Sequence, residues 1–309
     1  MRRAHILRAA AVVTLVVQFC MAEATAQERG AAQEQPAAVT LTTEAAKAEA
    51  RAHRARGLEA YRAGRFAEAA REFERATQAL PDYAEGYNDL AMARTSLGEF
   101  GAVVELLERA VRLQPRRAEM QYNLGTAYYR AGRFEESVAA LREAVRLQPA
   151  HPWAHGNLGV SLYDLGRYEE AAREFGRAAE LQPRRAETHY LLALCHEQAG
   201  RRAQAVESLL EAVRLRPRFA EAHNSLGVAY FGDGRHSEAT DAFRRAVEIK
   251  PDYAEARYNL GAASLAREAR DTAVEQYRAL RALDAGLAAK LHNGLFGGML
   301  LDVSGRAPE

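Results

Sequence analysis

Six prolines recur along this chain at intervals of 34 residues, and no other feature of the sequence constrains the fold as strongly. They are Pro81, Pro115, Pro149, Pro183, Pro217 and Pro251. A fixed short period means that each unit is one supersecondary element, too small to bury its own apolar face and stabilised by stacking on its neighbours. The sequence therefore predicts a solenoid, which acts through an extended surface.

Alignment on the prolines divides the chain into seven units in which the same residue types return at the same positions. The units are residues 50–83, 84–117, 118–151, 152–185, 186–219, 220–253 and 254–287. Position 7 is leucine in all units but the first, position 8 is always glycine or alanine, and position 24 is always large and apolar. Position 20 is alanine or serine except at Val103.

These positions have the spacing of helices. Positions 4, 7, 8 and 11 share one helical face, and positions 20, 24 and 27 share another, so each unit is expected to hold two amphipathic helices. Small residues at positions 8 and 20 let the two helix axes approach closely. A glycine at position 15 suits the end of the first helix, and the proline at position 32 ends the second. The predicted fold class is all-α, with seven helix-turn-helix repeats.

Residues 118–137 show the pattern most fully, as Ala-Glu-Met-Gln-Tyr-Asn-Leu-Gly-Thr-Ala-Tyr-Tyr-Arg-Ala-Gly-Arg-Phe-Glu-Glu-Ser. In this segment and across residues 50–287 the chain resembles the tetratricopeptide repeat family. The resemblance implies a right-handed superhelical solenoid whose first helices line a concave groove. It also implies binding of peptides or protein surfaces rather than catalysis.

The first 26 residues have the composition of an export signal. Three arginines in the first eight residues precede the uncharged run 9–22, which is shorter than the about 20 residues that span a bilayer as a helix. Two Ala-x-Ala sites follow, and cleavage is expected after Ala26. Bulky Phe19 argues against lipid attachment at Cys20. These features predict an exported protein, periplasmic or secreted, and the alternative is an anchor formed by an uncleaved N-terminal segment.

The segments that flank the repeats have different compositions. Residues 27–43 are rich in Ala, Gln and Glu and are expected to form a disordered leader, with helix starting at about Thr43. Residues 288–309 are expected to form a capping helix and a tail. The tail is apolar and interrupted by glycines, so it either folds back on the solenoid or serves as a docking segment.

The charge of the chain excludes several classes of partner. The full chain has 42 basic and 41 acidic residues, and removal of residues 1–26 takes away three basic and one acidic residue, leaving a net charge of −1. Such a balance gives no long-range attraction for nucleic acid or for anionic lipid. We expect no nucleic-acid partner, no membrane insertion after signal cleavage, and either a monomer or a subunit of a hetero-complex.

The residues expected to contact a partner lie on the first helix of each repeat. Positions 2, 5, 9 and 12 form one stripe, and the family resemblance places that stripe on the concave wall. Tyrosines there offer stiff contact area, although tyrosine and leucine also serve packing between units. Asparagines at position 6 resemble the ladder with which some family members hold a peptide backbone. Only Asn123, Asn157 and Asn259 match it, so a partial grip around repeats 3 and 4 is expected and a continuous ladder is not. The candidate contact residues are Asn88, Tyr122, Asn123, Tyr129, Trp153, Asn157, Tyr163, Tyr190, Asn224, Phe231 and Tyr258.

Trp153 is the only tryptophan of the chain and stands where five other units have glutamate. It has two interpretations, an aromatic anchor at the lip of the groove or a side chain folded over the neighbouring loop. Tryptophan is enriched at binding hot spots.

Catalysis and metal binding are not expected. Histidine occupies position 4 in four units, as His53, His155, His189 and His223. Equivalent positions of stacked units lie ~8–10 Å apart, whereas zinc ligands lie within ~2.3 Å of one ion. His196-Glu197 starts a metalloprotease-like motif, but Gly200 replaces its second histidine. Cys195 occupies a position that is small in other units and is expected to be a packed core residue.

Two functions of different kinds remain. The first is a scaffold or adaptor in the cell envelope that binds a peptide or partner helix in a tyrosine-lined groove. The alternative is a structural subunit of an envelope assembly that docks through its convex face or its ends. Neither function requires a cofactor.

Overall fold

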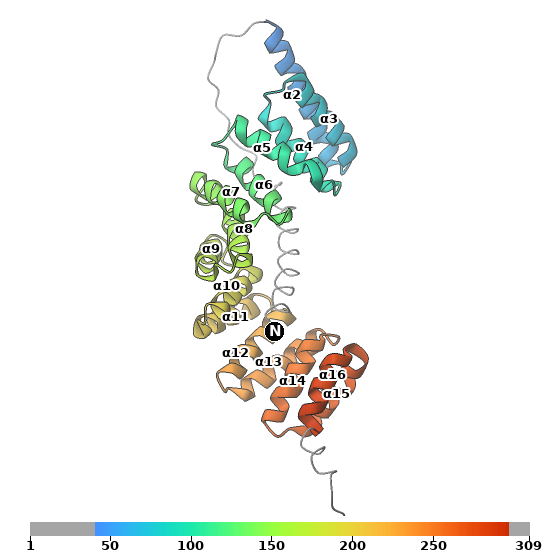
Figure 1. Ribbon diagram of the computed structural model, residues 1–309, viewed down its shortest axis with the longest axis vertical. Helices are drawn as coiled ribbons and strands as arrows, with labels where there is room; N and C mark the ends of the chain where they lie inside the picture. The colour runs from blue at the N-terminus through green and yellow to red at the C-terminus, as the bar shows by residue number, and fades with distance from the viewer. Residues whose placement is uncertain (1–40, 297–309) are drawn as a thin grey trace, which may run out of the picture. The chain divides into compact units, whose positions relative to one another are not determined.

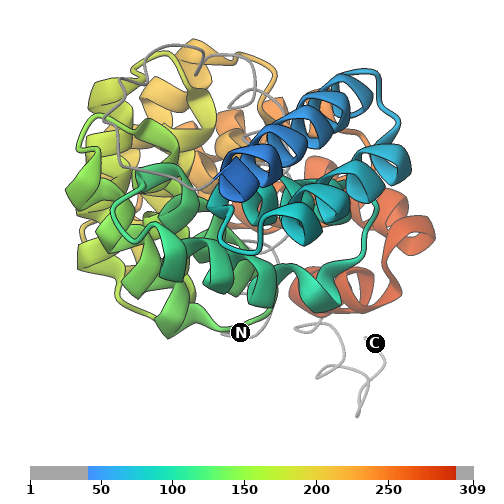
Figure 2. The same cartoon turned by 90° about the horizontal axis from the view of Figure 1, so that it is seen from above.

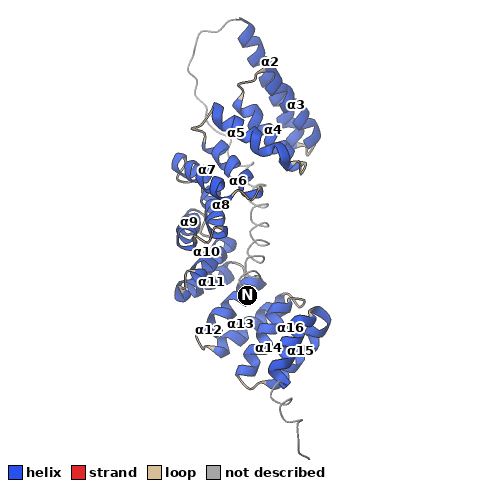
Figure 3. Ribbon diagram, in the orientation of Figure 1, coloured by secondary structure: helices blue, strands red, loops and turns tan. Residues whose placement is uncertain are grey.

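The computed structural model describes residues 41–296, and these residues form fifteen α-helices and one short 3₁₀ helix, with no strand among them (Figure 3). The chain divides into two compact units whose boundary lies between Leu181 and Gln182. Each repeat is one pair of helices, and the consecutive packing of these pairs confirms the predicted all-α repeat fold.

The first unit contains repeats 1 to 4 (Figure 1). Its elements are α2 (Leu41–Arg62), α3 (Phe66–Ala79), α4 (Ala84–Ser96), η1 (Phe100–Ala102), α5 (Val103–Leu113), α6 (Ala118–Arg130), α7 (Phe134–Leu147), α8 (Pro152–Asp164) and α9 (Tyr168–Leu181). Within this unit consecutive helices pack on each other, as α2, α3 and α4 show in both views (Figures 1 and 2).

The second unit contains repeats 5 to 7 and a final helix. Its elements are α10 (Ala186–Gln198), α11 (Arg202–Leu215), α12 (Ala220–Gly232), α13 (His236–Ile249), α14 (Ala254–Ala266), α15 (Arg270–Leu283) and α16 (Ala285–Phe296). Helix α16 packs on both α14 and α15, where Leu291 and Leu295 are buried.

The ends of the described region differ slightly from the predicted boundaries. Helix α2 starts at Leu41 rather than at about Thr43. Helix α16 extends to Phe296, within the segment 288–309 where a capping helix and a tail were expected. The predicted signal segment 1–26, the leader 27–40 and the remaining tail 297–309 lie outside the described residues.

The turn that follows the first helix of each repeat contains a residue with a positive φ angle. Glycine occupies this place in six repeats, for example Gly132 with φ 73°, and Glu268 occupies it in the seventh with φ 60°. The left-handed region is accessible to glycine without steric cost but is unfavourable for a residue with a Cβ atom. The short turn between the paired helices therefore contains local strain only in repeat 7.

The close contact between paired helices depends on the residues at positions 8 and 24. In repeat 6 a Cβ atom built on Gly227 would lie 2.6 Å from ring atoms of Phe243, so glycine is needed for the ring to lie against α12. In repeat 2 the same two positions hold Ala91 and Leu107, which share one buried cluster. In repeats 2 and 6 the pair thus combines the larger ring with glycine and the smaller leucine with alanine.

The side chain at position 4 makes the same hydrogen bond at six repeat junctions. It donates to the backbone carbonyl of the proline that ends the preceding repeat, over 2.6–3.2 Å. The six donors are Tyr87, Gln121, His155, His189, His223 and Arg257. A carbonyl oxygen only accepts, so each of the three histidines carries a proton on Nε2. The recurrent histidine is therefore one of several donors that hold the loop between repeats.

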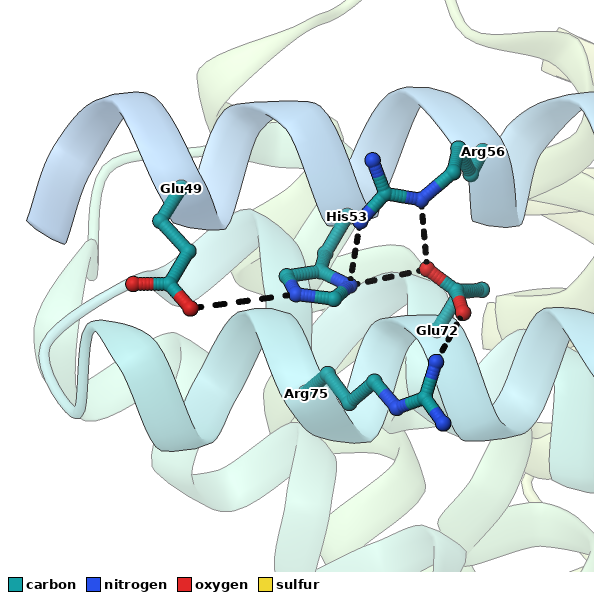
Figure 4. A network of polar contacts seen from close by, with 5 residues as sticks. All are labelled: Glu49, His53, Arg56, Glu72 and Arg75. Carbon is teal, nitrogen blue, oxygen red and sulfur yellow. Dashed lines mark hydrogen bonds and ion pairs between the residues drawn. The ribbon is translucent and has the colours of Figure 1, made fainter.

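In repeat 1, which follows no such proline, position 4 belongs to a polar network between α2 and α3 (Figure 4). Nδ1 of His53, Nε of Arg56 and Nη1 of Arg75 lie 2.8, 2.9 and 2.6 Å from the carboxylate oxygens of Glu72. Burial by itself raises the pKa of the Glu72 carboxyl, but the hydrogen bonds from His53 and Arg56 outweigh it and the pKa is lowered overall. The network therefore favours the ionised carboxylate.

Candidate partner-binding site

Repeat 2 lacks an aromatic contact that other repeats of the first unit share. In repeats 1, 3 and 4 an aromatic residue at position 12 packs on an aromatic residue at position 17, with ring centroids 5.2–5.5 Å apart; the pairs are Tyr61–Phe66, Tyr129–Phe134 and Tyr163–Tyr168. Position 12 of repeat 2 is Thr95, which has no ring. Its position 17 is Phe100, and this side chain is 51% exposed.

The second helix of repeat 2 also starts differently. Residues Phe100–Ala102 form the 3₁₀ helix η1, and α5 starts at Val103, whereas the corresponding helix of repeat 3 starts at position 17 with Phe134. Val103 stands at position 20, where other repeats have alanine or serine, and it is buried in one cluster with Ala91 and Leu107. Repeat 2 therefore replaces a regular first turn with a tighter one beside an exposed aromatic ring.

These differences leave a pocket between α4, α5 and α6. It contains about 540 Å³ of empty space, part of which is open to solvent. Its walls are mostly apolar and include Met92, Thr95, Val104 and Ala127, and its large exposed side chains are Phe100 and Arg130. A mostly apolar concavity with few polar groups is the usual form of a binding pocket.

Arg130 gives this pocket a positive charge that no acidic side chain neutralises. Its guanidinium lies over the ring of Phe100, 5.4 Å from the centroid, and among residues 41–296 it makes no ion pair with a carboxylate. Burial lowers the pKa of Arg130, yet a guanidinium stays charged at any physiological pH. Nearby Arg133 instead pairs with Glu136 at 2.9 Å. The pocket thus combines apolar walls with an available cation.

The position-6 asparagines make hydrogen bonds between neighbouring repeats. Each of them donates a hydrogen bond to the position-5 side chain of the preceding repeat: Asn123 to Asn88 at 2.8 Å, Asn157 to Tyr122 at 3.3 Å, and Asn259 to Asn224 at 2.9 Å. Stacking places position 5 of one repeat opposite position 6 of the next, so these side chains are within reach of each other. The asparagines therefore join neighbouring repeats through these hydrogen bonds.

Several other candidate contact residues are also engaged within the fold. Asn88, Tyr122, Asn157, Tyr190 and Asn224 are buried, and a buried side chain has no free surface to offer a partner. For these five residues the packing interpretation describes the structure.

The remaining candidates are more accessible. Tyr129 donates a hydrogen bond to Asp164 of the next repeat at 2.7 Å. Burial, and to a lesser extent this carboxylate, raise the pKa of the Tyr129 hydroxyl. Trp153, Tyr163 and Tyr258 are partly buried, and Phe231 on α12 is 38% exposed. Of all the candidate residues only Asn123 lines the pocket of repeat 2.

Phe100 and Arg130 were not among the candidate residues, although two sequence signals mark their location. Thr95 interrupts a series that reads Tyr61, Tyr129 and Tyr163 at the same position, and Val103 is the one large residue at position 20. An aromatic residue at position 17 without its ring partner at position 12 is the pattern that points to an exposed Phe100.

Three further features of the described part of the chain concern metal binding, the cysteine and the length of apolar helices. Residues 41–296 hold no group of three or more His, Cys, Asp or Glu side chains placed to bind a metal. Cys195 is fully buried, and burial raises the pKa of its thiol, which makes the thiolate rare. Within the same residues no helix has the length and apolar character needed to cross a membrane.

Comparison with protein families identifies the repeats. The tetratricopeptide repeat model matches residues 54–102, 88–152, 157–203 and 197–254, which together make up more than half of the chain. The protein belongs to the tetratricopeptide repeat family. No curated protein matches the chain in a sequence search.

Solved structures show the same fold. The crystal structure of YrrB, described as a TPR protein with an unusual peptide-binding site, is 22% identical with a TM-score of 0.55 and covers 60% of this chain and 95% of its own. MamA from Desulfovibrio magneticus is 22% identical with a TM-score of 0.52, covering 55% and 96%. A chain of the APC/C hetero-tetramer Cut9–Hcn1 is 20% identical with a TM-score of 0.53, covering 70% and 42%.

Proposed function

We propose that this protein is a non-catalytic interaction module that binds a segment of another protein, and that the pocket of repeat 2 receives a large apolar side chain of that segment. The observation that carries the proposal is the half-exposed Phe100 beside an apolar pocket, with Arg130, which pairs with no carboxylate among residues 41–296, over its ring. The repeat architecture supports it, since stacked repeats act through extended surfaces. The peptide-binding site named for YrrB supports it by analogy of fold.

The pocket defines the chemistry of the segment it binds. Burial of a Leu, Met or Phe side chain contributes about 1.5–3 kcal/mol, and this is the larger part of the expected affinity. A carboxylate next to that side chain would pair with Arg130, where an exposed ion pair adds about 0.2–1 kcal/mol. The ligand is therefore an apolar side chain with an acidic neighbour, and the charge contributes more to selectivity than to affinity.

We propose further that the protein acts outside the cytoplasm after cleavage behind Ala26, as the composition of residues 1–26 indicates. The test is the mass and N-terminal sequence of the protein recovered from the periplasm or medium of a cell that expresses the full chain. A mature N-terminus at Gln27 would support export, and an intact Met1 in the cytoplasm would refute it.

The pocket hypothesis is tested by selection of peptides from a display library on the mature protein. Enriched peptides should share a large apolar residue with an aspartate or glutamate close to it. Selected peptides are then titrated against a Thr95→Tyr variant, which restores the aromatic residue that repeats 1, 3 and 4 carry at this position and so fills the pocket. Loss of one buried apolar side chain predicts binding weaker by roughly tenfold to a hundredfold.

Charge variants separate the role of Arg130 from a general effect of charge. Arg130→Ala should weaken the binding of acidic peptides by a few fold. Arg62→Ala removes the arginine at the same position of repeat 1 and should change nothing, because Arg62 does not line the pocket. Selected peptides that bind Thr95→Tyr and the wild type equally well would refute the pocket as the binding site.

A further inference from the structure

The C-terminal segment of the chain has the chemistry that the pocket selects. Residues 297–309, which follow α16, read Gly-Gly-Met-Leu-Leu-Asp-Val-Ser-Gly-Arg-Ala-Pro-Glu. Three large apolar residues, Met299, Leu300 and Leu301, are followed directly by Asp302. The leader at residues 27–40 contains no large apolar residue apart from Val39. After signal cleavage, 297–309 is therefore the segment outside the described region that matches the pocket.

We propose that segment 297–309 of one copy of this protein binds the pocket of repeat 2 in a second copy, with Leu300 between the apolar walls and Asp302 paired with Arg130. The inference rests on the proposed function of the pocket and names a ligand for it. An extended segment places residues i and i+2 on one side, about 6.6 Å apart. Arg130 itself lines the pocket, so one short extended segment can place an apolar side chain in the pocket and a carboxylate beside the guanidinium.

The charges of the two partners are complementary. Arg130 makes no ion pair with a carboxylate among the described residues, and Asp302 supplies the missing carboxylate. Asp302 is also the first acidic residue after Phe296, so the apolar run and its charge come as one short motif. A bound Leu300 and a paired Asp302 would satisfy both features of the pocket at once.

The short tether favours a second copy over the same chain. Leu300 follows Phe296 by four residues, a span of at most about 14 Å. Phe296 packs in the last repeat against Tyr277 and under Arg270, whereas the pocket belongs to repeat 2. The pocket also includes α6 of repeat 3, so three complete repeats, 4 to 6, come between them along the chain, and a repeat contacts only its neighbours. The pocket and the segment are different surfaces, so the contact is heterologous and joins copies head to tail.

The first test uses a synthetic peptide of residues 297–309, labelled and titrated by fluorescence anisotropy into the mature protein. To prevent competition from its own tail, the protein carries Leu300→Ser. The peptide should bind, and Thr95→Tyr in the protein should weaken binding by tenfold or more. On protein that keeps Arg130, a peptide with Asp302→Lys should bind more weakly than the unchanged peptide. On Arg130→Ala protein, much of that difference in affinity should vanish. Arg62→Ala is the matched control and should have no effect.

The second test concerns the source of the segment. A copy with Thr95→Cys is mixed with a copy with Leu300→Cys under mild oxidation, and the two should form a disulfide-linked heterodimer. A copy with Arg62→Cys should not form one with the Leu300→Cys copy. Cys195 does not interfere because its thiol is buried. In wild-type protein the average mass from light scattering should rise with concentration, and Leu300→Ser or Thr95→Tyr should abolish that rise.

The outcomes separate this inference from the proposed function. If library peptides bind in a Thr95→Tyr-sensitive way but the 297–309 peptide does not, the tail is not the ligand and the pocket hypothesis stands. If neither binds, both are refuted. If the 297–309 peptide binds but a chain with both cysteines forms only an intramolecular disulfide, or the wild type stays monomeric at all concentrations, association between copies is refuted.

Discussion

The match between positions 8 and 24 predicts that two unfavourable substitutions compensate each other. Gly227 on α12 lies against Phe243 on α13, and a Cβ atom at residue 227 would lie 2.6 Å from two ring carbons. Every repeat with an aromatic residue at position 24 has glycine at position 8, and both repeats with alanine at position 8 have leucine at position 24. Gly227→Ala with Phe243→Leu would give repeat 6 the pair found in repeats 2 and 5.

The expected energies follow from these contacts. Gly227→Ala gains about 1 kcal/mol of helix propensity but overpacks a buried ring, at a cost of about 1–3 kcal/mol. Phe243→Leu alone leaves unfilled space in the core and should cost about 1 kcal/mol. In the double variant the smaller leucine accepts the new methyl group, so the overpacking and most of the lost packing disappear. The coupling energy between the two sites should be about 2 kcal/mol.

Hydrogen exchange measured by mass spectrometry is the suitable assay, because stability in a repeat protein is local and unfolding of the whole chain need not be two-state. Amides of α12 and α13 should exchange faster in each single variant and at nearly the wild-type rate in the double variant. Gly156→Ala is the matched control, since nothing lies within 4 Å of its added Cβ atom. It should slow exchange in α8 through propensity alone. Additive effects of the two repeat-6 substitutions would refute the packing argument.

Three further predictions concern the turn, the polar network and the repeat junction. Glu268→Gly should stabilise repeat 7 by roughly 1 kcal/mol, seen as slower exchange in α14 and α15, because residue 268 has φ 60°. Glu72→Gln should destabilise repeat 1 at neutral pH and have little effect in acid, measured by urea denaturation at a series of pH values. The lowered pKa of Glu72 means that its contribution is present above the ordinary value of 4.5 and is lost as the pH falls through the folded-state pKa. Asn259→Ala should cost about 1–3 kcal/mol at the junction of repeats 6 and 7, since it leaves the buried side chain of Asn224 without its donor.

Each of these has a contrary result. Unchanged or faster exchange in Glu268→Gly would show that the left-handed turn is not strained by its side chain. A Glu72→Gln effect that is constant from neutral to acid pH would mean that the carboxylate charge is not the source of stability. Equal exchange in wild-type and Asn259→Ala protein would show that water replaces the lost hydrogen bond.

The architecture could be predicted from the sequence because every repeat carries nearly the same residue types at the same positions. Proline at position 32, glycine at position 15 and small residues at position 8 each act through local backbone or packing constraints, and seven copies average out the exceptions. The helices accordingly start and end within a few residues of the predicted places. The one irregular start, at Val103, is also the one large residue at position 20.

The candidate site was harder to predict because its determinants are relations between repeats. From the sequence alone, a tyrosine or asparagine that faces a partner cannot be distinguished from one that faces the next repeat. Asn157, for example, donates a hydrogen bond to Tyr122. The position-4 histidines gave no hint of their proline carbonyl partners until the stacking was known. Phe100 is exposed because repeat 2 has Thr95 at the position where repeats 1, 3 and 4 have a tyrosine. A search for favourable residue types does not detect a partner that is missing.

The side chains that join neighbouring repeats also restrict the order in which these repeats can follow one another. Arg54 pairs with Asp89, Asn88 with Asn123, and Tyr122 with Asn157, so the first three junctions have different complementary pairs at the same two positions. If repeats 2 and 3 were exchanged, Arg54 would face Asn123 and the buried carboxylate of Asp89 would lose its cation. A gene that duplicated or shuffled these repeats would have to remake such pairs, so the pairs limit which of these repeats can follow which.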